Sequence, residues 1–230
     1  MMSIKQNEKI IQNEMNKLRN NVILYLFTDL ITKENGSKER KCLACSGVLA
    51  ILESLANFSQ GKLSFEEFST EENPEMAKKY KVEKIPTILF LDENEKEIIR
   101  YLASPMGNEL VPFMKIIQYY SGLHDFYKDT IQTNLKKISK SKIDLFITQT
   151  CPYCPTAVPI ASLFAILSNG KISLRIIDIN ENPDFAMKYQ VMGVPHTMIN
   201  EKDHIYGMFT PQELMEKLTK GKQDFGGMYA

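Results

Sequence analysis

The 230-residue sequence contains no tryptophan, only four cysteines and no excess of charge of either sign. Lys and Arg total 28, and Asp and Glu also total 28, so the formal net charge is zero. Without a basic excess the chain has no electrostatic attraction for phosphate backbones, and we expect no nucleic-acid partner. The composition, 43% hydrophobic and 24% charged, is that of an ordinary globular protein with room for one large or two small domains.

Long hydrophobic runs are also missing. No apolar segment approaches the roughly 18 residues that a membrane-spanning helix requires. Residues 1–20 have neither the apolar centre nor the small-residue cleavage pattern of a secretory signal. The sequence therefore predicts a cytoplasmic protein with no membrane partner. In that reducing compartment, cysteines are more often catalytic or metal-binding than structural.

The four cysteines form two pairs of identical spacing within an internal repeat. The motif CLAC, residues 42–45, lies 109 positions before CPYC, residues 151–154. The same offset aligns "ENPEMAKKYKVEKIPT", residues 72–87, with "ENPDFAMKYQVMGVPH", residues 181–196. A match of this length indicates two copies of one folding unit, each with its own cysteine pair.

The first copy carries an insertion directly in front of its cysteine pair. The strands expected over residues 22–28 and 142–148 match at an offset of 120, which exceeds the offset of the cysteines by 11. The extra residues form a polar segment with a turn-forming Asn-Gly, and we expect a loop that changes access to Cys42. Three cations of this segment are expected to favour the thiolate of that cysteine: Lys38, Arg40 and Lys41.

The order of elements is the same in both copies. Each is expected to contain a helix, a strand, a helix opened by the cysteine pair, a strand, a short helix, a Pro-led strand, a hairpin strand and a closing helix. The Pro-led strands fall at residues 85–92 and 194–200. This order predicts an α/β protein of two tandem units, each a central mixed sheet flanked by helices. We place the units at residues 1–122 and 123–230.

A CxxC pair at the start of a helix is suited to thiol–disulfide exchange. Unpaired N–H groups and the helix dipole favour negative charge on the first cysteine, which raises its thiolate fraction. The second cysteine, one turn further, is more buried and resolves the mixed disulfide. We therefore predict Cys42 and Cys151 as attacking thiols and Cys45 and Cys154 as resolving thiols, with no other cofactor and no metal.

The strand, the CxxC helix and the later Ile-Pro or Val-Pro resemble thioredoxin. The chain as a whole resembles the protein disulfide oxidoreductases of thermophilic archaea and bacteria, a glutaredoxin-like family with two thioredoxin-like folds in tandem. The resemblance implies cis bonds before Pro86 and Pro195, and pairing of the Ile85 and Val194 backbone with a bound substrate peptide. It also implies protein disulfides as substrates, for reduction, oxidation or isomerisation, and a thioredoxin-reductase-like electron donor.

Two departures from the thioredoxin pattern affect the expected chemistry. Many thioredoxins place a buried acid six residues before the first cysteine, where the second copy has Leu145. Its neighbour Asp144 falls on the opposite face of the strand, so a buried proton acceptor is not expected. CLAC lacks the proline of CPYC, so the two centres are expected to differ in reduction potential, with CPYC dominant.

Two other functions stay open on the sequence alone. Two CxxC pairs could supply the four thiolates of a zinc site, although 105 residues separate them, against roughly 15–20 in zinc ribbons. The chain could also be a peptide-binding chaperone whose thiols are secondary. The two registered motifs favour a thiol–disulfide exchange enzyme over both of these alternatives.

Overall fold

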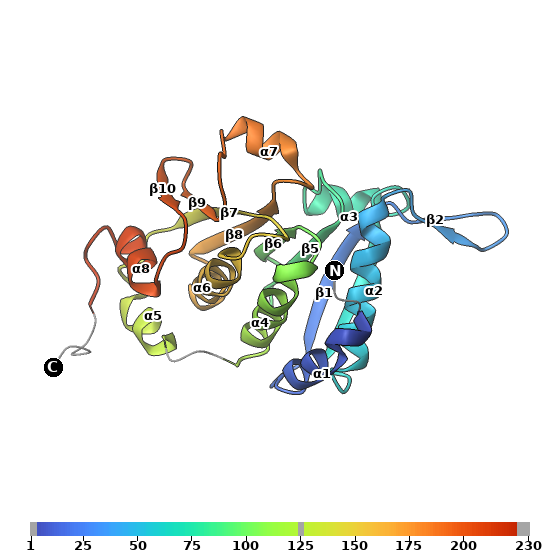
Figure 1. The fold of residues 1–230 in the computed structure, drawn as a ribbon, viewed down its shortest axis with the longest axis horizontal. Helices are drawn as coiled ribbons and strands as arrows, with labels where there is room; N and C mark the ends of the chain where they lie inside the picture. The colour runs from blue at the N-terminus through green and yellow to red at the C-terminus, as the bar shows by residue number, and fades with distance from the viewer. Residues whose placement is uncertain (1–3, 124–126, 225–230) are drawn as a thin grey trace.

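One continuous sheet runs through the whole molecule. The computed structural model describes residues 4–123 and 127–224 (Figure 1). Within these residues eight strands form a mixed sheet in the order β10-β9-β7-β8-β6-β5-β1-β4, and β2 and β3 form a separate ribbon. The expected α/β class is confirmed.

The elements follow the predicted order in both copies. The elements of the first copy are α1 (Ile4–Met15), β1 (Val22–Thr28), β2 (Ile31–Thr32), β3 (Lys38–Glu39), α2 (Leu43–Asn57), β4 (Leu63–Ser69), α3 (Pro74–Lys79), β5 (Thr87–Leu91), β6 (Glu97–Leu102), the 3-10 turn η1 (Gly107–Glu109) and α4 (Leu110–Tyr120). The elements of the second copy are α5 (Lys128–Asn134), β7 (Ser141–Ile147), α6 (Cys154–Leu167), β8 (Ile172–Asp178), α7 (Pro183–Lys188), β9 (His196–Ile199), β10 (Asp203–Tyr206) and α8 (Pro211–Thr219).

The helices cover the two faces of the sheet unequally. The largest core cluster joins side chains of α1, α2, α4, α5, α6 and α8 to one face. On the other face α3 packs over Phe27 and Leu89, and α7 packs over Phe146 and Ile177. Figure 1 shows the short helices α3 and α7 on the side opposite to the long helices. The long apolar helices bury the most surface, and this burial is the main stabilising contribution.

The two copies meet along a strand pair. β6 of the first copy pairs in parallel with β8 of the second, from Ile99 opposite Leu174 to Leu102 opposite Ile177. Above this junction α4 packs directly against α6. The end of the first copy therefore lies beside the CPYC helix of the second, a contact that the linear repeat did not predict.

Because β5 and β9 run antiparallel to β1 and β7, each Pro-led strand starts at the end of the sheet where its CxxC segment lies. β5 runs antiparallel to β1 and Thr87 lies opposite Phe27, near the end of β1. β9 runs antiparallel to β7 and His196 lies opposite Phe146, near the end of β7. The CxxC segments follow β1 and β7. The prolines just before β5 and β9 therefore lie at the same end of the sheet as the CxxC segments.

The inserted polar loop is a short antiparallel β-ribbon closed by the Asn-Gly turn. Ile31 pairs with Glu39 and Thr32 with Lys38 in antiparallel register. The Asn35 side chain accepts a hydrogen bond from the Ser37 backbone and Gly36 takes a positive φ of 78°, as a tight turn requires. The ribbon extends outward from the end of β1 in Figure 1. Among the described residues, no helix has the length and apolar character needed to cross a membrane.

Candidate active site

Each CxxC pair forms a disulfide. The Cα atoms are 5.3 Å apart in Cys42–Cys45 and 5.6 Å apart in Cys151–Cys154. Cys45 and Cys154 are fully buried, as expected of resolving thiols. Cys42 is partly exposed, whereas only 5% of Cys151 is exposed. The attacking sulfur of CPYC is therefore the less accessible of the two.

The backbone around each attacking sulfur favours the thiolate. The Cys45 N–H donates to Cys42 Sγ at 3.1 Å, and the Cys154 N–H donates to Cys151 Sγ at 3.0 Å. Cys42 is the N-cap of α2. Cys151 lies three residues before α6, which begins at Cys154, so the CPYC pair opens the helix with its second cysteine. The N–H bond to its sulfur is kept even so, and such bonds stabilise negative charge.

Both predicted cis prolines are confirmed. The Ile85–Pro86 and Val194–Pro195 bonds are cis. Both prolines are buried, whereas Ile85 and Val194 are partly exposed. Ile85 and Val194 lie at the same end of the sheet as the CxxC segments.

A single zinc site made from all four cysteines is excluded by the sheet. β1 and β7, which lead to the two CxxC motifs, lie four strand positions apart. At the usual spacing of neighbouring strands this is about 19 Å. Zinc holds its sulfur ligands at about 2.3 Å, so the two pairs cannot share one ion.

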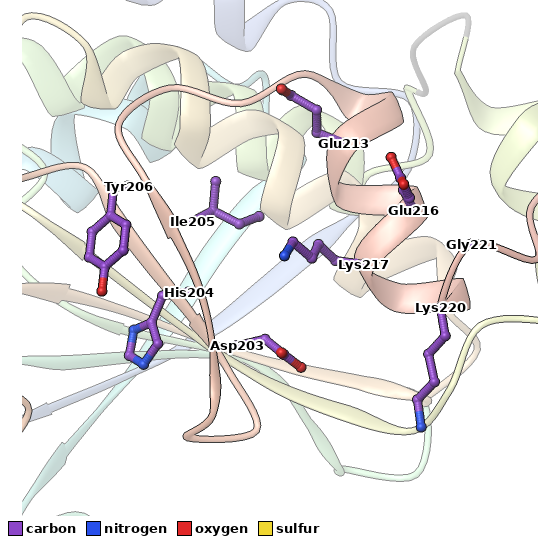
Figure 2. A pocket seen from close by; sticks show the side chains of 9 residues that line it. All are labelled: Asp203, His204, Ile205, Tyr206, Glu213, Glu216, Lys217, Lys220 and Gly221. Carbon is purple, nitrogen blue, oxygen red and sulfur yellow. The ribbon is translucent and has the colours of Figure 1, made fainter.

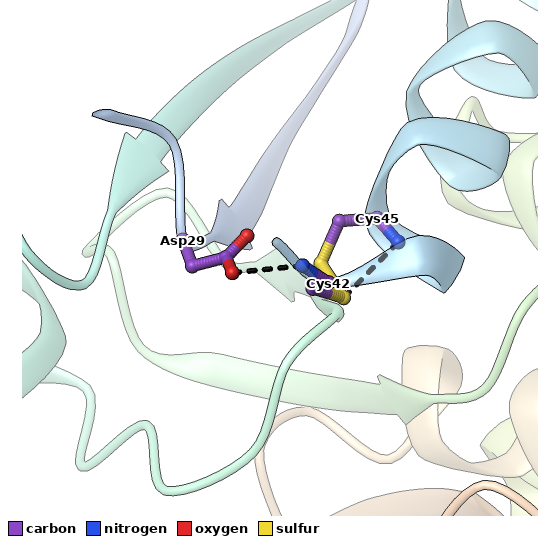
Figure 3. Close-up of side chains that lie close together, drawn as sticks. All are labelled: Asp29, Cys42 and Cys45. Carbon is purple, nitrogen blue, oxygen red and sulfur yellow. Dashed lines mark hydrogen bonds between the residues drawn. A yellow bond between two sulfur atoms is a disulfide. The ribbon is translucent and has the colours of Figure 1, made fainter. Parts of the chain in front are cut away.

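An acid that the sequence did not predict lies beside Cys42, and one of the three predicted cations is paired elsewhere. Arg40 pairs with the carboxylate of Glu67, with Nε–Oε1 and Nη2–Oε2 distances of 2.7 and 2.5 Å. Asp29 instead lies next to the disulfide, and its Oδ2 accepts from the Cys42 N–H at 2.8 Å (Figure 3). The sequence pattern did not point to Asp29. Its signal was an acid immediately after the strand that leads into the inserted segment.

Replacing Asp29 with asparagine is expected to make reduced Cys42 react at least about threefold faster with iodoacetamide at neutral pH, because a nearby negative charge is removed. Asparagine still accepts the hydrogen bond from the Cys42 backbone, so the local shape is kept. The measurement is the alkylation rate in a Cys151→Ser/Cys154→Ser background with a metal chelator present. An unchanged or slower rate would contradict the electrostatic role of Asp29.

A buried acid that the sequence did not predict lies in the turn η1, which is attached to the CPYC segment. Glu109, at the start of α4, is fully buried, and neither of its carboxylate oxygens has a hydrogen-bond partner in the described part of the chain. Burial, reinforced by the negative charge of Asp178, raises the pKa of Glu109 to about 8. Glu109 is therefore a neutral carboxylic acid near pH 7, able to release a proton when a base forms beside it.

The turn that carries Glu109 is attached to the CPYC segment. The Asn108 side chain donates to the carbonyl oxygen of Cys151 at 3.1 Å, and the Asn108 N–H donates to that of Gln149 at 3.0 Å. Gly107 has a φ of +57°, and a Cβ there would lie 2.8 Å from the Gln149 oxygen, so only glycine fits. The first copy thus positions the active-site segment of the second. The signal in the sequence was a single acid opening an otherwise apolar helix.

Asp144 lies on the face opposite Leu145, as predicted. It is buried and forms a two-point ion pair with Arg175, with both N–O distances at 2.6 Å. Both carboxylate oxygens of Asp144 are thus bound to Arg175 on the neighbouring strand β8. Asp144 therefore does not act as a proton acceptor for CPYC.

One hollow of the second copy belongs to neither centre. It lies between β10 and α8 and is lined mainly by charged side chains, among them Glu213 and Lys217 (Figure 2). His204 borders it and is hydrogen-bonded through Nδ1 to Nε2 of His196 at 2.8 Å. No predicted site residue lines this hollow.

Two repeated α/β units, each with a CxxC disulfide and a cis proline at one edge of the sheet, define a disulfide oxidoreductase of tandem thioredoxin domains. A thioredoxin family model matches residues 40–116, and a thioredoxin-domain model matches residues 141–220. The chain is 35% identical over 83 residues to a thioredoxin of Methanocaldococcus jannaschii, covering 98% of that protein and 36% of this chain. The chain therefore belongs to the thioredoxin family.

Two solved structures share the double fold along their whole length. One is a protein disulfide oxidoreductase from Aeropyrum pernix, with a TM-score of 0.78 and 24% identity, covering 95% of this chain and 94% of that one. The other is the N-terminal domain of an alkylhydroperoxide reductase from Enterococcus faecalis, with a TM-score of 0.79 and 22% identity, covering 94% of this chain and all of that one. At this identity the likeness establishes the fold, and the predicted fold class is confirmed.

Proposed function

We propose that the protein exchanges dithiols and disulfides on protein substrates, that CPYC is its dominant centre, and that the two units divide after Gly122. The observation that supports this best is the environment of the CPYC segment. A backbone N–H points at Cys151 Sγ, and the turn that bears the buried acid Glu109 is attached to the same segment. A sulfur stabilised as a thiolate and a neighbouring proton carrier are the two requirements of the exchange.

The proposed reduction of a substrate proceeds in two displacements. The Cys151 thiolate attacks one sulfur of the substrate disulfide, the substrate S–S bond breaks, and the other substrate sulfur leaves as a thiolate and takes up a proton. Cys154 then loses its proton and attacks Cys151 Sγ, which releases the second substrate thiol and forms the Cys151–Cys154 disulfide. Two electrons pass to the substrate. A dithiol donor, such as a thioredoxin-reductase-like protein, returns them. Isomerisation requires only the first displacement and its reversal.

In this scheme Glu109 gives its proton to the departing substrate thiolate and, once ionised, accepts the proton of Cys154. Its carboxyl group is neutral near pH 7, so the residue is a proton donor in the resting state and an acceptor once ionised. Glu109 thus belongs to the first copy but moves protons for the CPYC centre of the second copy.

Exposed apolar side chains next to each centre suit an unfolded peptide substrate. Leu43, which follows Cys42, is 94% exposed, and Tyr153 between the cysteines of CPYC is 55% exposed. Met192, three residues before the cis proline of the second copy, is 95% exposed. With them, the partly exposed backbone of Ile85 and Val194 would pair with an extended substrate segment. Peptide binding of this kind serves exchange and does not require a separate chaperone function.

The test is the reduction of insulin disulfides by dithiothreitol, followed by the turbidity of the released chains. The wild-type protein is expected to accelerate the reaction. The variant with all four cysteines changed to serine is expected to match the reaction without protein. Equal acceleration by both proteins would reject the proposal.

A further inference from the structure

We propose that the reduced CLAC centre, together with Asp29, binds a thiophilic divalent cation such as Zn²⁺. One carboxylate oxygen of Asp29 and the sulfurs of Cys42 and Cys45 lie within 4.8 Å of one another (Figure 3). This inference goes beyond disulfide exchange, because it gives one of the two centres a second, metal-bound state.

The carboxylate of Asp29 is held in place by the backbone. Its Oδ2 accepts from the Cys42 N–H at 2.8 Å and from the Lys41 N–H at 3.1 Å. Its Oδ1 is buried and has no hydrogen-bond partner among the described residues. An unsatisfied buried carboxylate oxygen is costly, and a cation is one partner that would relieve that cost.

The donor set matches the coordination chemistry of zinc. Two cysteines spaced as C-x₂-C at a helix start form half of many structural zinc sites, and a carboxylate oxygen is a third accepted ligand. At distances of about 2.3 Å to sulfur and about 2.1 Å to oxygen, one position of a tetrahedron stays open for water. Three anionic ligands outweigh the two positive charges of the ion.

Cation binding is coupled to the redox state of the pair. A dithiol or phosphine donates two electrons, breaks the Cys42–Cys45 S–S bond and leaves two thiols. Binding of Zn²⁺ to both sulfurs then releases two protons to solvent. The oxidised centre cannot bind the ion in this way, because each sulfur is committed to the disulfide. A bound ion in turn blocks Cys42 as a nucleophile.

The second centre serves as an internal control. At the position that corresponds to Asp29 it has Gln149, whose amide is a poor zinc ligand. Among the described residues, the Asp29 group is the one cluster of three or more Cys, His, Asp or Glu side chains with ligand geometry. The proposed site therefore distinguishes the two centres.

The test is an anaerobic titration of the full-length protein, reduced with a phosphine, with Zn²⁺ in competition with a chromophoric chelator. Co²⁺ provides a spectroscopic check, since thiolate-to-cobalt charge transfer and strong ligand-field bands report tetrahedral sulfur ligation. The variants are Asp29→Asn, Cys42→Ser and the control Cys151→Ser/Cys154→Ser. Asp29→Asn keeps the hydrogen bond to Cys42, so any loss of affinity reports the lost ligand and not a lost fold.

We expect one ion per reduced chain and none per oxidised chain. Affinity is expected to fall at least about 10-fold in Asp29→Asn, to be lost in Cys42→Ser, and to be unchanged in the control. Absence of stoichiometric binding, equal affinity in Asp29→Asn, or loss of binding in the control would each overturn the inference. The insulin assay of the metal-free protein is independent of this result, so disulfide exchange can stand if the metal site fails.

Discussion

Changing Cys151 and Cys154 to serine is expected to lower insulin reduction by about 10-fold, whereas the same change at Cys42 and Cys45 is expected to leave more than half of the activity. The reason is the unequal proton chemistry of the two centres. Asp29 places a negative charge beside Cys42 and opposes its thiolate, while the turn bearing the buried acid Glu109 is attached to the CPYC segment.

Accessibility favours the opposite result, since Cys42 is more exposed than Cys151. The assay therefore shows which factor sets the dominant centre: the greater exposure of Cys42 or the chemical activation of Cys151. It is made at equal protein concentration with chelator present, and circular dichroism of each variant confirms that the fold is kept. A greater loss in the Cys42→Ser/Cys45→Ser protein would show that access dominates and that CLAC is the main centre.

Changing Glu109 to glutamine is expected to stabilise the protein at pH 7 to 9 by a few kcal/mol and to leave its stability nearly unchanged below pH 4.5. The pKa of Glu109 is raised from 4.5 to about 8, mainly by burial and further by Asp178. Between pH 4.5 and about 8, the native state therefore keeps a proton on Glu109 that the unfolded state has lost. The contribution of Glu109 to stability is complete below pH 4.5 and is lost as the pH rises through 8. A shift of this size corresponds at most to about 5 kcal/mol.

Glu67→Gln is the matched control, and its expected sign is opposite. Burial alone would raise the pKa of Glu67, but the ion pair with Arg40 and the hydroxyl of Thr28 lower it overall. Its contribution is present above pH 4.5 and is lost as the pH falls through its lowered pKa, so the glutamine variant is destabilised at neutral pH. The measurement for both is urea unfolding across pH 4 to 9. A Glu109→Gln protein no more stable than wild type at pH 8 would contradict the assignment of a buried neutral acid.

The sequence predicted those parts of the site that are local or repeated. Each CxxC pair, the helix after it and the proline 44 residues later recur in the same register, so one copy supports the interpretation of the other. The cis bonds before Pro86 and Pro195 and the paired elements follow from this repeat, and the structure confirms them.

The contacts that the sequence did not predict are long-range. The turn that carries Glu109 is attached to the CPYC segment because α4 of the first copy packs on α6 of the second. Periodicity within one copy cannot indicate which element of the other copy lies beside it. The acid beside Cys42 was not predicted for a similar reason. Neighbours in sequence, such as Arg40, turned to Glu67 on β4, while Asp29, 13 residues away, lies beside the cysteine.

The β6–β8 pairing also limits how the chain can be divided. Each half on its own would present an additional sheet edge, with the unpaired N–H and C=O groups of β6 or β8 open to solvent. Exposed edges of this kind recruit strands from other molecules and promote aggregation. In the part of the chain that the structure describes, the two halves cover these edges for each other, and β4 and β10 are the two outermost strands of the sheet. The pairing of β6 with β8 thus gives each half a built-in partner for a strand that would otherwise be open to pairing with other molecules.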